Sequence, residues 1–125
     1  MNLDETQLYV AATRANAVWR VPLRDLEVTR AGTFIQMSGG TVGPDGLALD
    51  EEGGVVAAHP GIGVWRFDRL GRPTHLIESP AGNFCTNVAF GGDDRRQLYI
   101  TESESGTILR AELPVPGRPM FSHLA

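Results

Sequence analysis

The sequence contains no lysine, and all 11 of its basic residues are arginines. Its 15 acidic residues outnumber them, so the formal net charge is −4 at pH 7. The arginines are scattered along the chain and form no basic stretch of the kind that binds phosphate backbones. The composition therefore argues against nucleic acid as a partner. The missing lysine is typical of a GC-rich genome rather than of anion binding.

The chain has a single cysteine, Cys85, so an internal disulfide and a multi-thiolate metal site are excluded. Because Cys85 lies in an apolar run, we expect a small buried side chain rather than a nucleophile. No apolar run approaches the ~20 residues that cross a bilayer, and residues 1–5 do not resemble a signal peptide. These observations predict a cytoplasmic protein with no membrane partner.

Helical patterning is also missing, since no 3.6-residue apolar stripe lasts more than two turns. Short apolar runs alternate instead with glycine, proline, asparagine and aspartate, which is typical of strands joined by tight turns. One block returns three times: an apolar strand, a turn, and an arginine-bearing strand centred on Trp19, Trp65 or Leu109. These centres are about 45 positions apart, close to the length of one four-stranded β-propeller blade.

We therefore predict an all-β fold, a β-propeller segment of about three blades, over residues 1–42, 43–82 and 83–125. The second blade is expected to have strands at 45–49, 54–59, 63–68 and 74–78. The third is expected to have strands at 85–90, 97–102, 107–113 and 119–124. The first shows only 7–12, 17–23 and 26–37, so we expect this blade to lack its inner strand.

Asp45 is the carboxylate with the clearest functional context, because it lies in a Pro44-Asp45-Gly46 turn before a predicted inner strand. Proline fixes φ at position 44, and glycine leaves position 46 without a Cβ atom. The turn can therefore direct the Asp45 side chain toward a central channel, where a carboxylate suits a hard metal ion. A solvated Asp-Gly turn without function is the alternative interpretation of the motif.

Three further residues are candidates for lining the channel. In the inner-strand repeat, Thr86 aligns with Asp45 and Asn87 aligns with Gly46, although hydrogen bonding at a strand start is an alternative role for both. His59 ends a second strand before a Pro-Gly turn and could line the channel mouth or simply be hydrogen-bonded there. No Gly-x-Ser-x-Gly elbow is present, so the sequence gives no sign of a serine nucleophile.

Together, these motifs closely resemble the C-terminal half of the regucalcin/gluconolactonase family, also called the senescence marker protein type. The matching segments are 43–54, 64–68, 71–73, 86–92 and 98–102. The resemblance runs from about Asp4 to the C-terminus. It implies half of a six-bladed propeller whose channel holds one divalent cation, most often calcium, and which hydrolyses sugar lactones such as gluconolactone.

The resemblance also implies a ligand set for the cation: a first-blade glutamate, an asparagine of an Asn-Gly strand, and the aspartate of a Pro-Asp-Gly turn. Of this set, only the aspartate has a counterpart here, Asp45. The resemblance implies that Asp45 is a metal ligand and a catalytic residue. The other two are expected before Met1. We therefore expect this chain alone to bind calcium, zinc, magnesium or manganese weakly, and to be weakly active or inactive.

Open blade faces predict a homodimer or association with an N-terminal half, because a propeller protects its faces and edges by closing into a ring. The alternative function, from a different class, is a non-catalytic half-propeller that serves as a binding or assembly module. An NHL-type or strictosidine-synthase-like propeller is a third interpretation, but it gives no reason for the Pro-Asp-Gly turn.

Overall fold

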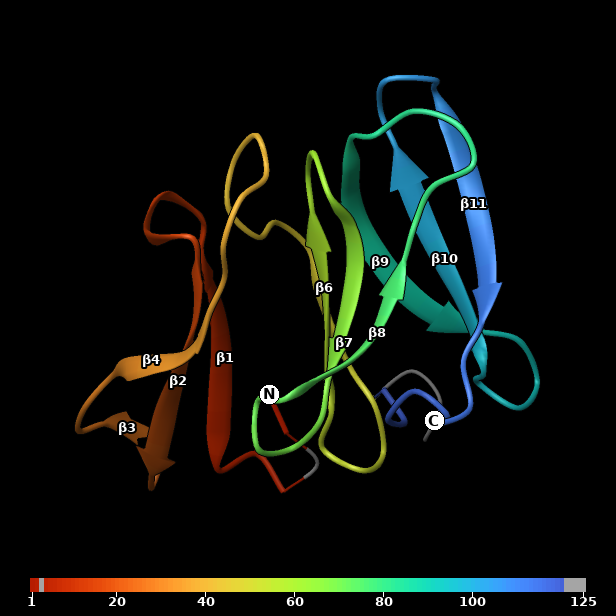
Figure 1. Cartoon of the computed structure of the whole chain (residues 1–125). Coiled ribbons are helices and arrows are strands. Elements are labelled where there is room, and N and C mark those ends of the chain that lie inside the picture. Colours follow the sequence, from red (N-terminus) through yellow and green to blue (C-terminus); the bar gives the residue numbers. More distant parts are fainter. Residues whose placement is uncertain (3, 121–125) are drawn as a thin grey trace.

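A computed structural model describes residues 1–2 and 4–120, and in this part of the chain three antiparallel sheets stand side by side (Figure 1). The first sheet contains β1 (Gln7–Ala12), β2 (Ala17–Arg24), β3 (Glu27–Val28) and β4 (Gly32–Gln36). The second contains β5 (Leu47–Leu49), β6 (Val55–His59), β7 (Gly63–Phe67) and β8 (Pro73–Ile77). The third contains β9 (Cys85–Gly91), β10 (Gln97–Glu102) and β11 (Thr107–Glu112).

The prediction of an all-β chain is confirmed, since the described residues contain no helix beyond one short 3₁₀ turn, η1 (Thr13–Ala15). No helix in this part of the chain is long and apolar enough to cross a membrane. The second sheet has the order β5-β6-β7-β8, and the third has the order β11-β10-β9. In both sheets, strands that follow one another in the sequence are hydrogen-bonded neighbours, as tight hairpin turns require.

Two of the expected strands differ in the structure. The single strand predicted at 26–37 is wrong, because β3 and β4 are separate and pair with different parts of β2. Asp25 and Leu26 have φ values of 51° and 64°, which form a tight turn directly after β2. This turn lets β3 pair with the end of β2, before the chain reaches β4. Of the strand predicted at 119–124, residues 119 and 120 belong to no strand, and the rest lies outside the described residues.

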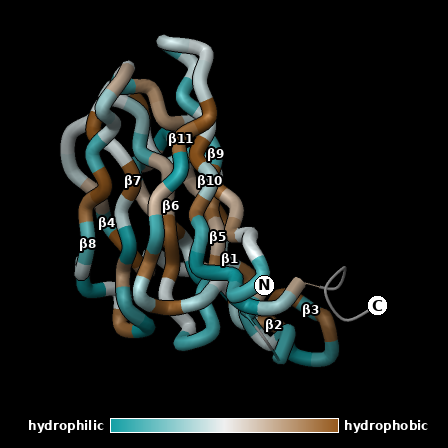
Figure 2. The backbone as a smooth tube through the Cα atoms, turned by 90° about the vertical axis from the view of Figure 1, so that its right-hand side faces the viewer, coloured by the Kyte–Doolittle hydropathy of each residue, from teal (hydrophilic) through white to brown (hydrophobic). Residues whose placement is uncertain are grey.

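The core consists of two clusters, one on each side of the second sheet. Strand β6 is buried along its whole length because its side chains point alternately to the two clusters. Val55 and Ala57 pack toward the first sheet, whereas Val56 and Ala58 pack toward the third. The hydropathy tube shows hydrophobic stretches along the central strands (Figure 2), as expected for strands that contribute to a core on both faces. Cys85 is buried in the second of these clusters, as predicted, and burial raises the pKa of its thiol.

The C-terminal part of the described chain crosses back beneath the second sheet. Gly117 forms an isolated bridge with Asp50, and the Arg118 N–H donates to the Leu49 carbonyl at 2.9 Å. The Arg118 guanidinium also donates to the carbonyl of Asn2 at 2.8 Å. A Cβ atom at Gly117 would lie 2.3 Å from the Phe90 ring, so this crossing requires glycine. Residues from both ends of the sequence thus meet below β5.

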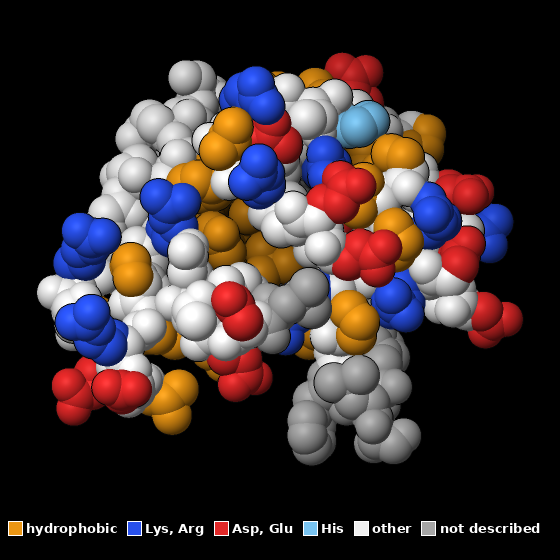
Figure 3. All heavy atoms as spheres, turned by 90° about the horizontal axis from the view of Figure 1, so that it is seen from below, with side chains coloured by type: hydrophobic (Ala, Val, Ile, Leu, Met, Phe, Trp, Pro, Cys, Tyr) orange, Lys and Arg blue, Asp and Glu red, His pale blue; other side chains and the backbone are white. Residues whose placement is uncertain are grey.

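On the lower face, arginine and acidic side chains alternate around a hollow in which hydrophobic side chains are visible (Figure 3). Among the described residues, Arg95 and Glu51 form an ion pair across 3.2 Å. The two signs are therefore mixed on this face, in agreement with the scattered arginines of the sequence.

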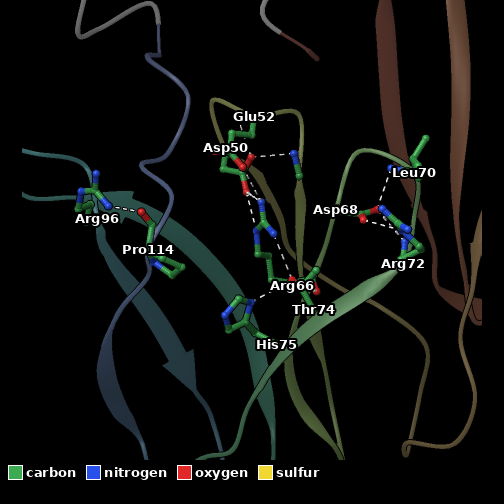
Figure 4. A network of polar contacts seen from close by, with 11 residues as sticks. Asp50, Glu52, Arg66, Asp68, Leu70, Arg72, Thr74, His75, Arg96 and Pro114 are labelled. Carbon is green, nitrogen blue, oxygen red and sulfur yellow. Dashed lines mark hydrogen bonds and ion pairs between the residues drawn. The ribbon is translucent and has the colours of Figure 1, made fainter.

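A buried ion pair joins the strands of the second sheet (Figure 4). The Arg66 Nε and Nη2 atoms both lie 2.8 Å from Asp50 Oδ2, and both side chains are almost fully buried. Asp50 Oδ1 accepts from the N–H groups of Gly54 at 2.7 Å and Glu52 at 3.0 Å. Arg66 Nη1 donates to the Thr74 hydroxyl at 3.2 Å. The pair therefore connects the β5–β6 turn to β7 and β8.

We predict that Asp50→Ala lowers the free energy of unfolding by about 3–5 kcal/mol, because it leaves the buried Arg66 charge with only the exposed Glu52 carboxylate, 3.7 Å away, as an ionic partner. Glu51→Ala is the matched control, since it breaks a partly exposed pair and should cost at most about 1 kcal/mol. Urea denaturation of both variants measures the difference. Equal losses in the two variants would contradict the importance of the buried pair.

Candidate functional site

Asp45 lies immediately before β5, at the upper end of the second sheet. Its N–H donates to the Ala58 carbonyl at 2.9 Å, which ties it to the end of β6. The carboxylate is exposed and has no hydrogen-bond or ion-pair partner in the described part of the chain. It is therefore a negative charge on a fixed backbone, available to a ligand.

The residues before Asp45 are held by the first sheet. The Thr13 hydroxyl donates to the Pro44 carbonyl at 2.8 Å. A Cβ atom at Gly43 would lie 1.9 Å from the Thr13 carbonyl oxygen, so the segment and the β1–β2 turn touch closely enough to require glycine. The β1–β2 turn of the first sheet thus holds the Pro-Asp-Gly turn in place from one side.

The residue after Asp45 is held by the third sheet. Gly46 donates its N–H to the Thr86 carbonyl at 2.9 Å. A Cβ atom at Gly46 would lie 2.0 Å from Asn87 Oδ1 and 2.7 Å from Asn87 Cα. Gly46 is not among the residues with positive φ, so its missing Cβ permits this close approach rather than a special backbone conformation. The structure therefore brings three of the predicted site residues, Asp45, Thr86 and Asn87, into one place.

A β-bulge positions Thr86 and Asn87 at the start of β9. Thr101 pairs with Asn87 and Glu102 pairs with Cys85, which leaves Thr86 as the extra residue. The Thr86 and Thr101 hydroxyl oxygens are 2.9 Å apart and share a hydrogen bond. Asn87 Oδ1 accepts from the Val88 N–H at 2.9 Å. Both candidate side chains consequently have defined orientations.

The structure places His59, the fourth predicted residue, below the segment that leads to Asp45. The side chain is fully buried, and its Nδ1 atom accepts from the Trp65 indole N–H at 3.3 Å. A Cβ atom at Gly40 would lie 2.6 Å from His59 Nε2, so the segment covers the ring. Burial lowers the pKa of His59, which keeps it neutral. It supports the segment from within and is not at the surface.

Glu102, which no motif of the sequence indicated, supports the candidate site from the neighbouring strand. Its buried carboxylate accepts from the N–H groups of Phe84, Glu104 and Ser105, and from the Ser105 hydroxyl. These hydrogen bonds, the one from the Ser105 hydroxyl above all, lower the pKa of Glu102 to about 2. Phe84 directly precedes β9. By accepting its N–H, Glu102 therefore fixes the start of the strand that carries Thr86 and Asn87. The sequence signal that could have indicated this role is the position of Glu102, an acidic residue directly before the Ser103-Glu104-Ser105-Gly106 turn.

The described residues fit a divalent cation only in part. The Asp45 carboxylate has the right chemistry for a hard ion, and Thr86 offers a neutral oxygen nearby. However, this part of the chain contains no group of three or more His, Cys, Asp or Glu side chains that could hold a metal. Calcium takes six to eight oxygen ligands, so Asp45 fits as one ligand and does not make a complete site.

Comparisons with known proteins show which family the chain resembles. Residues 1–104 match the model of the SMP-30/gluconolactonase/LRE-like region. A 6-deoxy-6-sulfogluconolactonase of Pseudomonas putida is 33% identical over 95% of this chain and 47% of its own length. The chain therefore spans about half the length of this relative.

Solved structures show the same similarity. Regucalcin from Agrobacterium tumefaciens, a calcium-binding protein, superposes with a TM-score of 0.81 and 30% identity over 94% of this chain and 45% of that protein. A gluconolactonase from Xanthomonas campestris gives a TM-score of 0.71 and 29% identity over 90% of this chain and 35% of that protein.

We predict that Gly46→Ala destabilises the chain by roughly 1–3 kcal/mol, the usual cost of overpacking, because the new methyl group meets the Asn87 backbone. Gly32→Ala is the matched control, since a Cβ atom there meets nothing within 4 Å and φ is not positive. Thermal or urea unfolding compares the two variants. If Gly46→Ala were as stable as Gly32→Ala, the close approach of Gly46 to Asn87 would be wrong.

Proposed function

The chain belongs to the SMP-30/gluconolactonase/LRE-like family, and we propose that it acts in the hydrolysis of a sugar lactone. The proposal includes a divalent cation, most often calcium, with Asp45 as one of its ligands and as a catalytic residue. One observation carries it: the exposed Asp45 carboxylate has no partner among the described residues, yet its backbone is held by all three sheets. A sulfogluconolactonase and a gluconolactonase among the relatives support the choice of substrate.

In this proposal, Asp45 contributes a fixed negative charge and a hydrogen-bond acceptor. Water adds to the acyl carbon of the lactone, the ring C–O bond breaks, and the ring oxygen receives the proton, which gives the open hydroxy acid. A cation held by Asp45 would polarise the carbonyl and make its bound water more acidic. The carboxylate itself can only accept, so its role is to orient a water O–H or to take its proton.

A non-catalytic binding or assembly module remains the second candidate. The observation that favours it is the incomplete ligand set, because the described residues contain no group of three or more His, Cys, Asp or Glu side chains that could hold a metal. A lactonase requires measurable, metal-dependent turnover of a lactone, whereas a module requires none. The activity assay below separates the two.

We predict that Asp45→Asn lowers metal-dependent gluconolactone hydrolysis by at least about a hundredfold, since even the loss of an outer-shell metal partner costs 10–100-fold. Asp93→Asn, at an exposed aspartate of the β9–β10 turn, is the control and should keep full activity. Hydrolysis is followed with a pH indicator in the presence of calcium, zinc, magnesium or manganese. No turnover with any of these ions, either by the unmodified chain alone or by its assembly with an N-terminal half, would favour the module instead.

We also propose that the chain associates with a second copy or with a separate N-terminal half. Leu8, Val10 and Trp19 lie on the face of the first sheet that is turned away from the second, with exposed fractions of 36%, 36% and 39%. On the outer face of the third sheet, Tyr99 and Ile108 are 41% and 73% exposed. Apolar strand faces of this kind are usually covered by a partner.

We predict that light scattering detects a dimer or a larger assembly at micromolar concentration, and that Trp19→Glu shifts it toward monomer. Leu26→Glu is the control, because Leu26 is 76% exposed in a turn away from this face. The expected physical reason is the cost of placing a charge in an apolar contact. A folded monomer in the unmodified protein would refute the proposed association.

A further inference from the structure

The neighbours of Asp45 on the third sheet are polar but uncharged. Thr86 and Asn87 follow one another at the start of β9, and Thr101 lies opposite Asn87 on β10. The backbone of this cluster contacts Gly46 directly, through the Gly46 N–H and the Thr86 carbonyl. The turn that carries Asp45 therefore lies next to residues with hydroxyl and amide groups.

The hydrogen bonds within the cluster determine which groups are left for a ligand. Asn87 Oδ1 is occupied by the Val88 N–H at 2.9 Å, and the described residues give the amide nitrogen no acceptor. Asn87 consequently presents two N–H donors. The Thr86 hydroxyl is held by Thr101 Oγ1 at 2.9 Å and keeps further hydrogen-bonding capacity.

We propose that Thr86 and Asn87 form a hydroxyl subsite, which binds the ring hydroxyl groups of a polyhydroxylated lactone beside Asp45. Thr101 acts as a positioning residue, because it fixes the orientation of the Thr86 hydroxyl. The inference rests on the proposed function and adds the basis of selectivity to it. Neutral donors and acceptors match the hydroxyl groups of a sugar ring, and a lactone without hydroxyl groups forms none of these hydrogen bonds.

The same residues could also serve the bulge alone, so the test must separate selectivity from structure. If Thr86 and Asn87 only stabilised β9, their replacement would weaken binding of every lactone by the same factor. If they form the hydroxyl subsite, the loss is confined to the hydroxylated ligand. The ratio of two affinities is therefore the informative quantity.

The experiment uses two lactams, which resist hydrolysis: D-glucono-1,5-lactam, which carries the hydroxyl groups, and 2-piperidinone, which lacks them. Binding to the ¹⁵N-labelled chain is measured by NMR, with divalent cation present. We expect the gluconolactam to bind at least about tenfold more tightly and to shift the amide signals of residues 86–88, since each neutral hydrogen bond is worth roughly 0.5–1.5 kcal/mol.

Asn87→Ala and Thr86→Val should each reduce the affinity ratio by roughly threefold to tenfold, which is the loss of one neutral hydrogen bond. Thr33→Val is the matched control, because Thr33 is an exposed strand threonine on β4 of the first sheet. Its affinity ratio should not change. Circular dichroism of each variant checks that the fold is retained, and the Thr86→Val variant leaves the Asn87 hydrogen bond to Val88 in place.

The outcomes also distinguish this inference from the proposed function. Equal affinity for both lactams, absence of binding, or an unchanged ratio in both variants would overturn the hydroxyl subsite, even if the chain hydrolyses lactones. Selective binding that depends on Thr86 and Asn87 in a chain without turnover would support the subsite and contradict the lactonase activity.

Discussion

The burial of β6 on both faces is the constraint on which the rest of the structure depends. Its alternate side chains supply one core cluster toward the first sheet and another toward the third, so the middle strand fixes both neighbours at once. The Asp50–Arg66 ion pair then joins the turn before β6 to the strands that follow it. Because the last residues of β6 also hold Asp45, the position of the candidate site follows from this packing.

The candidate site lies where the three sheets meet, and residues of all three hold it in place. Thr13 of η1, between β1 and β2 of the first sheet, binds Pro44, Ala58 of the second sheet binds Asp45, and Thr86 of the third binds Gly46. Two glycines allow the contacts to be this close, and neither needs an unusual φ to do so. A single exposed carboxylate is thus held rigidly without any direct contact to its own oxygens from the described residues, which leaves them available to a ligand.

The sequence predicted the strands well because its turns carry glycine, proline and aspartate at regular intervals. It failed where the backbone depends on particular conformations, as at Asp25 and Leu26, whose positive φ values separate β3 from β4. It placed Asp45 at a strand start from a turn motif, but the reason for Gly46 lies in Asn87, 41 positions away in the sequence and in contact only in the folded chain. The burial of His59 and the role of Glu102 likewise depend on contacts between segments that no local pattern describes.

We propose that the Asp45 carboxylate is a ligand of a divalent cation. The most direct measurement is a titration of the ¹⁵N-labelled chain with Mn²⁺, a paramagnetic ion that broadens the NMR signals of nearby nuclei. The structure predicts that broadening begins at the amides of Asp45, Gly46, Thr86 and Asn87, which lie together although they are distant in the sequence. Broadening that begins at other acidic residues, or that spares these four amides, would contradict the claim.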